Sequence, residues 1–305
     1  MPPKPPQVTY LLEQGKLKDI KLTKQQVARY LKYQWEYYSE LAYQRHLIHD
    51  ELKKVLIESS ITNYRFDKWQ RTVKYKYSLH PLSTAGSPRF IGGRFNAGVD
   101  INPEISSFPA LYIASDKDTA LQETLGQTAE KGSRLSAQEL ALTNPDSIAV
   151  VSVSGELEKV FDFRAAKYLD AFVNMTKGFK LSAALKASAR ILKLAAPSVA
   201  GRSKDLLETL LTKNWRVSPV HGDVPANSQI FGALIYQAGI EGILYPSKLT
   251  GKECLAIFPN NFAVTSSYIE LDDEPPHAKV ERRIDSNNWR VCALSPQELI
   301  VRTSA

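Results

Sequence analysis

The sequence predicts an α+β protein, and three observations lead to this prediction. Short apolar segments typical of strands are interleaved unevenly with amphipathic helical segments, whereas a doubly wound parallel sheet would alternate them regularly. Apolar residues make up 43% of the 305 residues and charged residues 23%, a composition that supports a sizeable core. No internal repeat is visible in the chain.

The N-terminal part is basic and rich in tyrosine. After a Pro-rich lead-in over residues 1–6, expected to be disordered, apolar and aromatic residues at helical spacing predict a helix over residues 23–57 with Thr23 as its N-cap. Residues 1–78 hold 11 Lys and 4 Arg against 8 acidic residues, a net charge of +7 that equals the charge of the whole chain. Nine of the 14 Tyr lie there as well. This segment is either a binding surface, for nucleic acid or a partner, or a helix packed on the main body with its Lys side chains in water, and we favour the second.

The middle of the chain alternates strands with one short helix. A strand pair, a loop rich in Pro, Gly and Ser, and two apolar strands are expected at residues 64–77, 80–102, 110–114 and 147–153. Ser115, followed by Asp118 three residues later, resembles a capping box and predicts a helix over residues 116–129.

The second half contains three helices and a group of short strands. After a short mixed segment at residues 161–171, amphipathic spacing predicts helices at residues 181–194, 203–213 and 228–238. Gly239 and Gly242 end the last of them. Strands are expected at residues 243–245, 254–258 and 264–271, before an acidic linker over residues 272–276 and a final strand or small tail.

Several classes of protein are excluded by motifs that the sequence lacks. No Gly-x-Gly-x-x-Gly, Walker A or Gly-x-Ser-x-Gly motif occurs, which argues against a Rossmann, P-loop or α/β-hydrolase site. Only His46 and His49 could share a helix face, too few ligands for zinc, so no metal is expected. We expect no membrane span and no signal peptide, and two cysteines, Cys254 and Cys292, fit a reducing cytoplasm.

Four positions have side chains suited to one chemistry. Arg94 follows two glycines in Gly-Gly-Arg-Phe-Asn, where a tight turn places a guanidinium for phosphate oxygens. Tyr112 stands at a strand end, where its ring could stack on a cationic ligand. Glu123 lies two turns into the next helix, at the edge of its buried face, and Ser247 follows a buried strand and a Pro. Each alone is an ordinary loop, core, surface or turn residue.

In this order, with these neighbours, the four positions resemble the RES domain family, named for Arg, Glu and Ser. The matching blocks are Gly-Gly-Arg-Phe-Asn-x-x-Gly, Leu-Tyr-x-Ala-Ser with Ala-Leu-x-Glu, and Gly-Ile-x-Gly-Ile-x-Tyr-x-Ser before an apolar strand. The resemblance covers residues 61–271, with an insert at about 164–219 that exceeds compact members. Residues 1–60 then form a helical extension and residues 272–305 a C-terminal tail.

The resemblance implies a fold like that of ADP-ribosyltransferases, with a split mixed β core, flanking helices and a cleft for NAD. It implies an enzyme that consumes NAD as substrate, with phosphate or water as acceptor and no further cofactor. Such enzymes are toxins of toxin–antitoxin pairs. Arg94 and Glu123 would be catalytic, and Arg94, Tyr112 and Ser247 would bind NAD.

Two alternatives remain open. One is transfer of ADP-ribose to a macromolecule, and the other is a nucleic-acid- or partner-binding protein with a degenerate NAD cleft. The expected partner is a helix-turn-helix antitoxin or a second copy of the chain, and nucleic acid is less favoured.

Overall fold

The computed structural model describes residues 17–74, 77–102, 105–125, 148–275, 280–294 and Glu298, with side chains from Lys24 onward. The chain divides into two compact units. The first unit consists of residues 1–47 and 179–199, and the second of residues 48–178 and 200–305. The helical extension expected over residues 1–60 is therefore shared between them, and so is the insert expected at about 164–219.

The first unit pairs a long helix with a segment from the insert. Helix α2 (Leu17–Leu47) packs against α7 (Ala183–Ile191) through a small apolar cluster that contains Tyr33. Two polar links reinforce it: Gln44 exchanges hydrogen bonds with the backbone of Lys180, and the Glu40 carboxylate accepts from the backbone and hydroxyl of Ser182. One aromatic face of α2 is thus a packing surface for α7.

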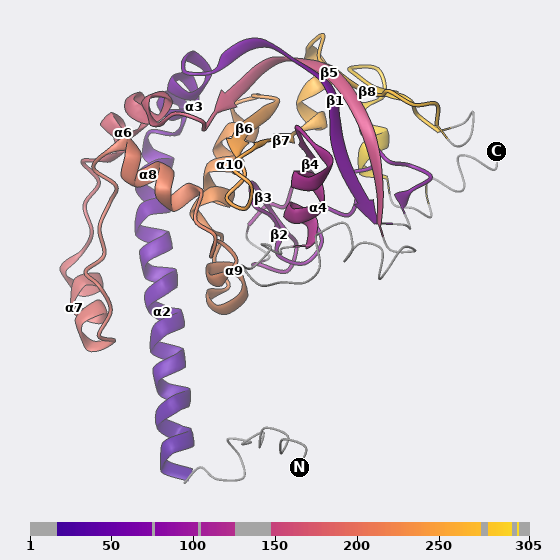
Figure 1. Cartoon of the computed structure of the whole chain (residues 1–305). Coiled ribbons are helices and arrows are strands. Elements are labelled where there is room, and N and C mark those ends of the chain that lie inside the picture. Colours follow the sequence, from indigo (N-terminus) through magenta and orange to yellow (C-terminus); the bar gives the residue numbers. More distant parts are fainter. Residues whose placement is uncertain are drawn as a thin grey trace, which may run out of the picture. The chain divides into compact units, whose positions relative to one another are not determined.

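The second unit is built on a mixed sheet of seven strands in the order β1-β4-β7-β6-β5-β8-β9. Its strands are β1 (Ile61–Lys74), β4 (Leu111–Ala114), β5 (Ile148–Asp162), β6 (Gly242–Pro246), β7 (Glu253–Ile257), β8 (Tyr268–Leu271) and β9 (Arg283–Ile284). β5 and β6 are parallel, and the other pairs are antiparallel. β1 also pairs with β5 along its length, so the pairings from β1 through β4, β7, β6 and β5 close on themselves. Figure 1 shows β1 and β5 as two long curved strands, which together form a two-stranded ribbon. The predicted combination of a sheet core with helices is confirmed.

Two apolar clusters lie on opposite faces of the central strands. Along β7, Cys254 and Ala256 belong to one cluster while Leu255 and Ile257 belong to the other, as the two-residue period of a strand requires. This burial on both faces explains why β6 and β7 are continuous apolar runs in the sequence. The first cluster is covered by helices, and the second lies against the β1–β5 ribbon.

Helices of the second unit cover the first cluster. They are α3 (His49–Glu58), α4 (Lys117–Leu125), η3 (Ala166–Leu169), α6 (Asp170–Thr176), α8 (Ser203–Leu210) and α10 (Asn227–Gln237). Helix α9 (Val217–Gly222) contributes no residue to this cluster, and the short turns η4 (Pro259–Val264) and η5 (Trp289–Ala293) contribute to the second cluster. In α3, Leu52 and Leu56 are fully buried. In α10, the Phe231 ring contacts Phe161 and Phe163 at 5.6 and 5.2 Å between centroids, so aromatic packing fixes α10 on the sheet.

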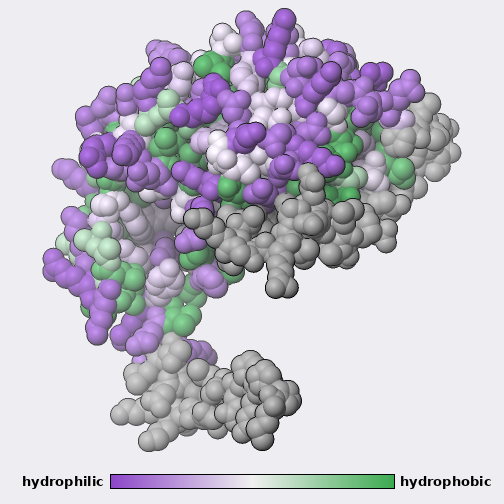
Figure 2. Space-filling view, in the orientation of Figure 1, coloured by the Kyte–Doolittle hydropathy of each residue, from purple (hydrophilic) through white to green (hydrophobic). Residues whose placement is uncertain are grey.

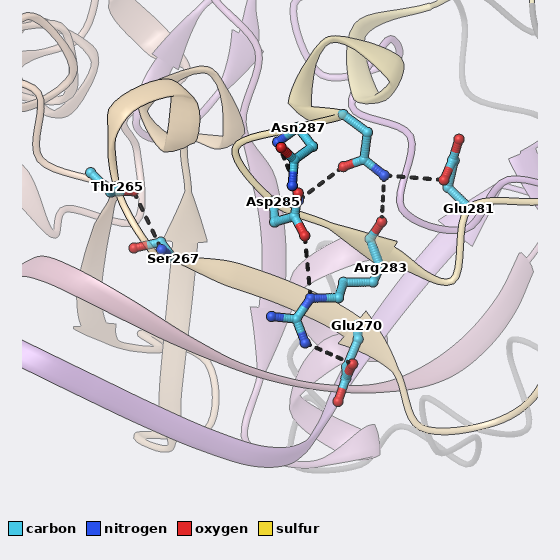
Figure 3. A network of polar contacts seen from close by, with 8 residues as sticks. Thr265, Ser267, Glu270, Glu281, Arg283, Asp285 and Asn287 are labelled. Carbon is cyan, nitrogen blue, oxygen red and sulfur yellow. Dashed lines mark hydrogen bonds and ion pairs between the residues drawn. The ribbon is translucent and has the colours of Figure 1, made fainter.

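Ion pairs stabilise β9, the strand at one end of the sheet order. Figure 3 shows Arg283 of β9 between Glu270 and Asp285, with contacts of 3.4 Å to each carboxylate. Its guanidinium also lies 3.7 Å from the centre of the Tyr268 ring. These contacts keep β9 on β8, although β9 has only two residues.

No helix among the described residues is long and apolar enough to cross a membrane. On the face seen in Figure 2, hydrophilic residues cover most of the described surface and apolar residues form small separate patches.

Three local predictions about the first half of the chain were wrong. The helix over residues 23–57 is two helices that meet at Ile48, and Thr23 lies inside α2 rather than at its start. The strand pair at 64–77 is the single strand β1, whose uneven alternation comes from a bulge between Phe66 and Trp69 where Lys68 has φ of 53°.

Two boundaries also differ from the prediction. The cap of α4 is Asp116 and not Ser115, because its carboxylate accepts from the Thr119 backbone N–H at 3.0 Å. The last core strand begins at Tyr268 rather than at residue 264, and Val264 ends the turn η4 with 93% of its surface exposed. The predicted helices at 181–194, 203–213 and 228–238 correspond to α7, α8 and α10. Residues 1–6, 126–129 and 147 lie outside the described residues.

Candidate active site

A cavity of about 610 Å³ opens in the second unit beside β1, β4 and α4. This volume falls within the range of small-molecule sites. Arg94, Tyr112 and Glu123 all line it, although they are distributed over a loop, a strand and a helix. Ser247 lies directly behind Glu123 and is itself 2% exposed. The fold thus brings the four predicted residues to one place, three of them on the cavity wall.

Arg94 stands at the tip of a hairpin formed by β2 (Gly92–Gly93) and β3 (Asn96–Ala97). Gly92 has φ of 80°, a conformation that glycine adopts without strain. Gly93 leaves room for Tyr112, whose hydroxyl would lie only 2.5 Å from a Cβ at this position. Gly92 therefore permits the tight turn before Arg94, and Gly93 permits the close approach of Tyr112.

Helix α10 contacts this hairpin and fixes its position. The buried Gln229 side chain donates to the backbone carbonyls of Ile91 and Gly93 at 2.7 and 3.0 Å. Gly232, one turn further, lies against the backbone of Phe95 so closely that a Cβ would be 2.0 Å from the Phe95 carbonyl oxygen. The position of Arg94 is thus set by residues more than 130 positions away in the sequence.

Tyr112 is tied to the same hairpin by its hydroxyl. The hydroxyl donates to Asn96 Oδ1 at 2.7 Å and accepts from the Phe95 backbone N–H at 2.9 Å. Burial raises the pKa of Tyr112, while the positive charges of Arg94 and Arg216 act in the opposite direction. The phenol is therefore neutral at physiological pH, and its ring forms part of the cavity wall.

Glu123 and Ser247 form a hydrogen-bonded pair. The Ser247 hydroxyl donates to Glu123 Oε1 at 2.6 Å and accepts from the backbone N–H groups of Leu249 and Thr250. A second link, between the hydroxyls of Thr119 and Thr250 at 3.0 Å, joins the same loop to α4. The loop after β6 thus fixes the carboxylate of Glu123 in the cavity. In this structure the Ser247 hydroxyl faces Glu123.

Arg71 of β1 is a cavity residue that the sequence reasoning missed. Its guanidinium is nearly buried and donates to the carbonyls of Pro81, Ser83 and Tyr112 at 2.7, 2.6 and 3.4 Å. Burial lowers the pKa of Arg71 to about 10, so it stays charged at neutral pH. A charged residue at an inward position of a strand, between Trp69 and Val73, is the signal that could have identified it.

Trp215 and Arg216 are two further cavity residues that were missed. Both lie between α8 and α9 and reach the site only through the fold. The Trp215 ring is buried, and the guanidinium carbons of Arg216 and Arg94 lie 4.5 and 6.0 Å from its centre. No sequence spacing connects this segment with Arg94, so only the three-dimensional structure could identify it.

The cavity is strongly cationic. Among the described residues that line it, Glu123 is the single acidic side chain, whereas the basic ones are Arg71, Lys74, Arg89, Arg94, Lys213, Arg216 and Lys248. Such a surplus favours an anionic ligand. In the described part of the chain, no group of three or more His, Cys, Asp or Glu side chains is placed to hold a metal ion.

Comparison with known proteins gives one family and one solved structure. The family model described as RES domain matches residues 68–278. A chain of the crystal structure of the M. tuberculosis MbcT-MbcA toxin-antitoxin complex is similar at 14% sequence identity and a TM-score of 0.38, over 83% of this chain and 97% of that one. The comparison with curated proteins finds no match.

Proposed function

The chain belongs to the RES domain family, and from this premise we propose that it is an NAD-consuming enzyme that cleaves the bond between nicotinamide and ribose. The observation that carries the proposal is the cationic cavity in which Glu123 is the single acidic side chain among the described lining residues. NAD presents the matching pattern, because its diphosphate is negative and its reacting end is positive. Because the chain belongs to the RES domain family, we also propose an ADP-ribosyltransferase-like fold.

The chemistry needs one carboxylate. Cleavage of the nicotinamide–ribose bond builds positive charge on the ribose, as in glycoside cleavage. Glu123 would stabilise that charge and hold a ribose hydroxyl. A second carboxyl group is not required as a general acid, because nicotinamide leaves as a neutral pyridine and needs no proton. The cavity with a single acid fits this reaction.

The other site residues have supporting roles in the proposal. The Tyr112 ring would stack on the nicotinamide, and its hydroxyl keeps the hairpin of Arg94 in place. Arg94 would bind the diphosphate. Ser247 contributes through Glu123, which its hydroxyl orients. Arg71, whose charge is nearly buried beside the cavity, would add to the positive potential.

The acceptor is phosphate or water. In either case an oxygen forms a bond to the anomeric carbon as the carbon–nitrogen bond breaks and its electron pair stays on nicotinamide. The proton of the attacking water or phosphate passes to solvent, and the products are nicotinamide with ADP-ribose phosphate or ADP-ribose. The test incubates the purified chain with NAD, with and without phosphate, and identifies both products by mass spectrometry. We expect nicotinamide release. A chain that releases none, in the absence of any inhibitor, would contradict the proposal.

A second experiment, with a cell extract in place of the purified chain alone, tests the alternative acceptor. If ADP-ribose goes to a macromolecule, labelled NAD added to a cell extract will give labelled protein or nucleic acid.

We propose that the enzyme acts as the toxin of a toxin–antitoxin pair. Its partner would be a helix-turn-helix antitoxin, or a second copy of the chain bound through residues 1–60.

Replacement of Ser247 by Ala tests the role of the Glu123–Ser247 pair. We expect kcat to fall about tenfold with little change in KM, because a hydrogen bond to a charged group contributes about 1.5–3 kcal/mol and here orients the reacting carboxylate. Steady-state kinetics with NAD measures this. In a Glu123→Gln background the same change should cost little more, and an equal, additive loss there would mean that Ser247 acts independently of Glu123.

A further inference from the structure

The segment between α8 and α9 contributes residues 213–216 to the cavity wall, and with them a second guanidinium, that of Arg216. The Thr212 carbonyl accepts from Arg94 Nη1 at 2.8 Å, which holds Arg94 against this wall. Trp215 is 5% exposed, and its ring is contacted by Arg216 at 4.5 Å and by Arg94 at 6.0 Å. The guanidinium groups of Arg94 and Arg216 therefore both lie beside the buried indole of Trp215 on the cavity wall.

Neither guanidinium forms an ion pair within the part of the chain that the structure describes. Among the described residues, no salt bridge involves Arg94 or Arg216. Partial burial and then the positive charge of Arg94 lower the pKa of Arg216, and the negative charge of Glu123 offsets this in part. Two like charges held beside one ring repel each other, and an anion bound between them would relieve the repulsion.

Arg71 cannot take this role. Each of its three guanidinium nitrogens already donates to a backbone carbonyl, and the group is nearly buried. Among the described residues, Arg94 donates to one carbonyl, and Arg216 is exposed at the cavity wall. The two arginines beside Trp215 thus retain most of their donors for a ligand, and a guanidinium binds phosphate oxygens in a bidentate manner.

We propose that Arg216 is a further substrate-binding residue, and that Arg94 and Arg216 together bind the diphosphate of a dinucleotide across Trp215. This inference rests on the proposed function and adds a specificity to it. The enzyme selects substrates that contain a diphosphate, and it discriminates NAD from nicotinamide mononucleotide, which has the same reacting bond but one phosphate. Trp215 and Arg216, which would provide this selectivity, lie in the insert at about 164–219.

Kinetics of Arg216→Ala on the two substrates tests the inference. We expect KM for NAD to rise about tenfold or more, with kcat changed much less, because a lost charge-assisted contact to a ground-state phosphate weakens binding. Turnover of nicotinamide mononucleotide should stay at its low wild-type level. Arg216→Lys should recover part of the loss, since it keeps the charge without the bidentate geometry.

Arg202→Ala is the matched control. It removes a positive charge at the start of α8, where Arg202 pairs with Asp205 outside the cavity, and should leave both substrates unaffected. Thermal unfolding of each variant shows whether the fold is intact, and the exposed position of Arg216 predicts that it is. An unchanged KM for NAD in a folded Arg216→Ala protein overturns the inference.

Binding of ADP, measured by calorimetry, separates this inference from the proposed function. We expect wild type to bind ADP more tightly than AMP, and Arg216→Ala to lose about tenfold in affinity for ADP but not for AMP. If wild type binds ADP in this manner yet releases no nicotinamide, the diphosphate site stands and the proposed reaction falls. If nicotinamide is released but ADP binding does not depend on Arg216, the reaction stands and the diphosphate site falls. Failure of both measurements rejects both.

Discussion

Glu123→Gln is expected to lower the kcat for nicotinamide release by about 10²–10³-fold, with a much smaller effect on KM. Glutamine keeps the size of the side chain and still accepts the Ser247 hydrogen bond, so the geometry of the cavity is preserved. What is lost is the negative charge that would stabilise the developing positive charge of the ribose, and electrostatic groups of this kind contribute about that much to rate. Nicotinamide release from NAD, followed in steady state, measures the effect.

Glu208→Gln is a suitable control, because Glu208 is an exposed residue of α8 that does not line the cavity. It should retain wild-type turnover. In cells, expression of the wild-type chain should arrest growth and Glu123→Gln should not. Equal turnover by wild type and Glu123→Gln would remove Glu123 from the reaction and with it the proposed mechanism.

Gly232→Ala is expected to damage both stability and activity, although alanine favours a helix by about 1 kcal/mol over glycine. An added Cβ would lie 2.0 Å from the Phe95 carbonyl oxygen and 2.7 Å from its carbon, both backbone atoms that cannot rotate away. Overpacking of this kind costs about 1–3 kcal/mol in the free energy of unfolding. Since Phe95 follows Arg94, the hairpin must shift, and a displacement of about 1 Å can cost about 10²-fold in rate.

Thermal denaturation and NAD turnover measure the two effects. Gly178→Ala is the matched control, because a Cβ at Gly178 would meet no atom within 4 Å and Gly178 has no positive φ. It should change neither property. A Gly232→Ala protein as stable and active as the control would mean that α10 does not set the position of the Arg94 hairpin.

The sequence predicted those site residues that lie in short motifs with recognisable neighbours. Arg94, Tyr112 and Glu123 belong to such motifs, and the structure places all three on one cavity wall. The partner of Ser247 could not be predicted, because the bond to Glu123 joins residues 124 positions apart. Trp215 and Arg216 belong to no motif, and only the position of α8 and α9 brings them to Arg94.

The fold shows the same division between local and long-range information. Helix periodicity predicted α7, α8 and α10, because an amphipathic pattern is a property of consecutive residues. The strand β1 was misread, because its bulge at Lys68 depends on pairing with β5, which lies some 80 residues later. The cap at Asp116 differs by one residue from the expected Ser115, a choice decided by which carboxylate or hydroxyl reaches Thr119.

The association of α2 with residues 179–199 has a practical consequence for shortened versions of the protein. Removal of residues 1–47 alone would remove the helix that covers Leu185 and Ala189 of α7. These apolar side chains would then be exposed to water and could promote aggregation. Removal of residues 1–60 would delete too much, because Leu52 and Leu56 belong to the interior of the second unit. A minimal protein for crystallisation should therefore start at Ile48 and replace residues 179–199 with a short flexible linker, a double excision that the linear order of the chain would never suggest.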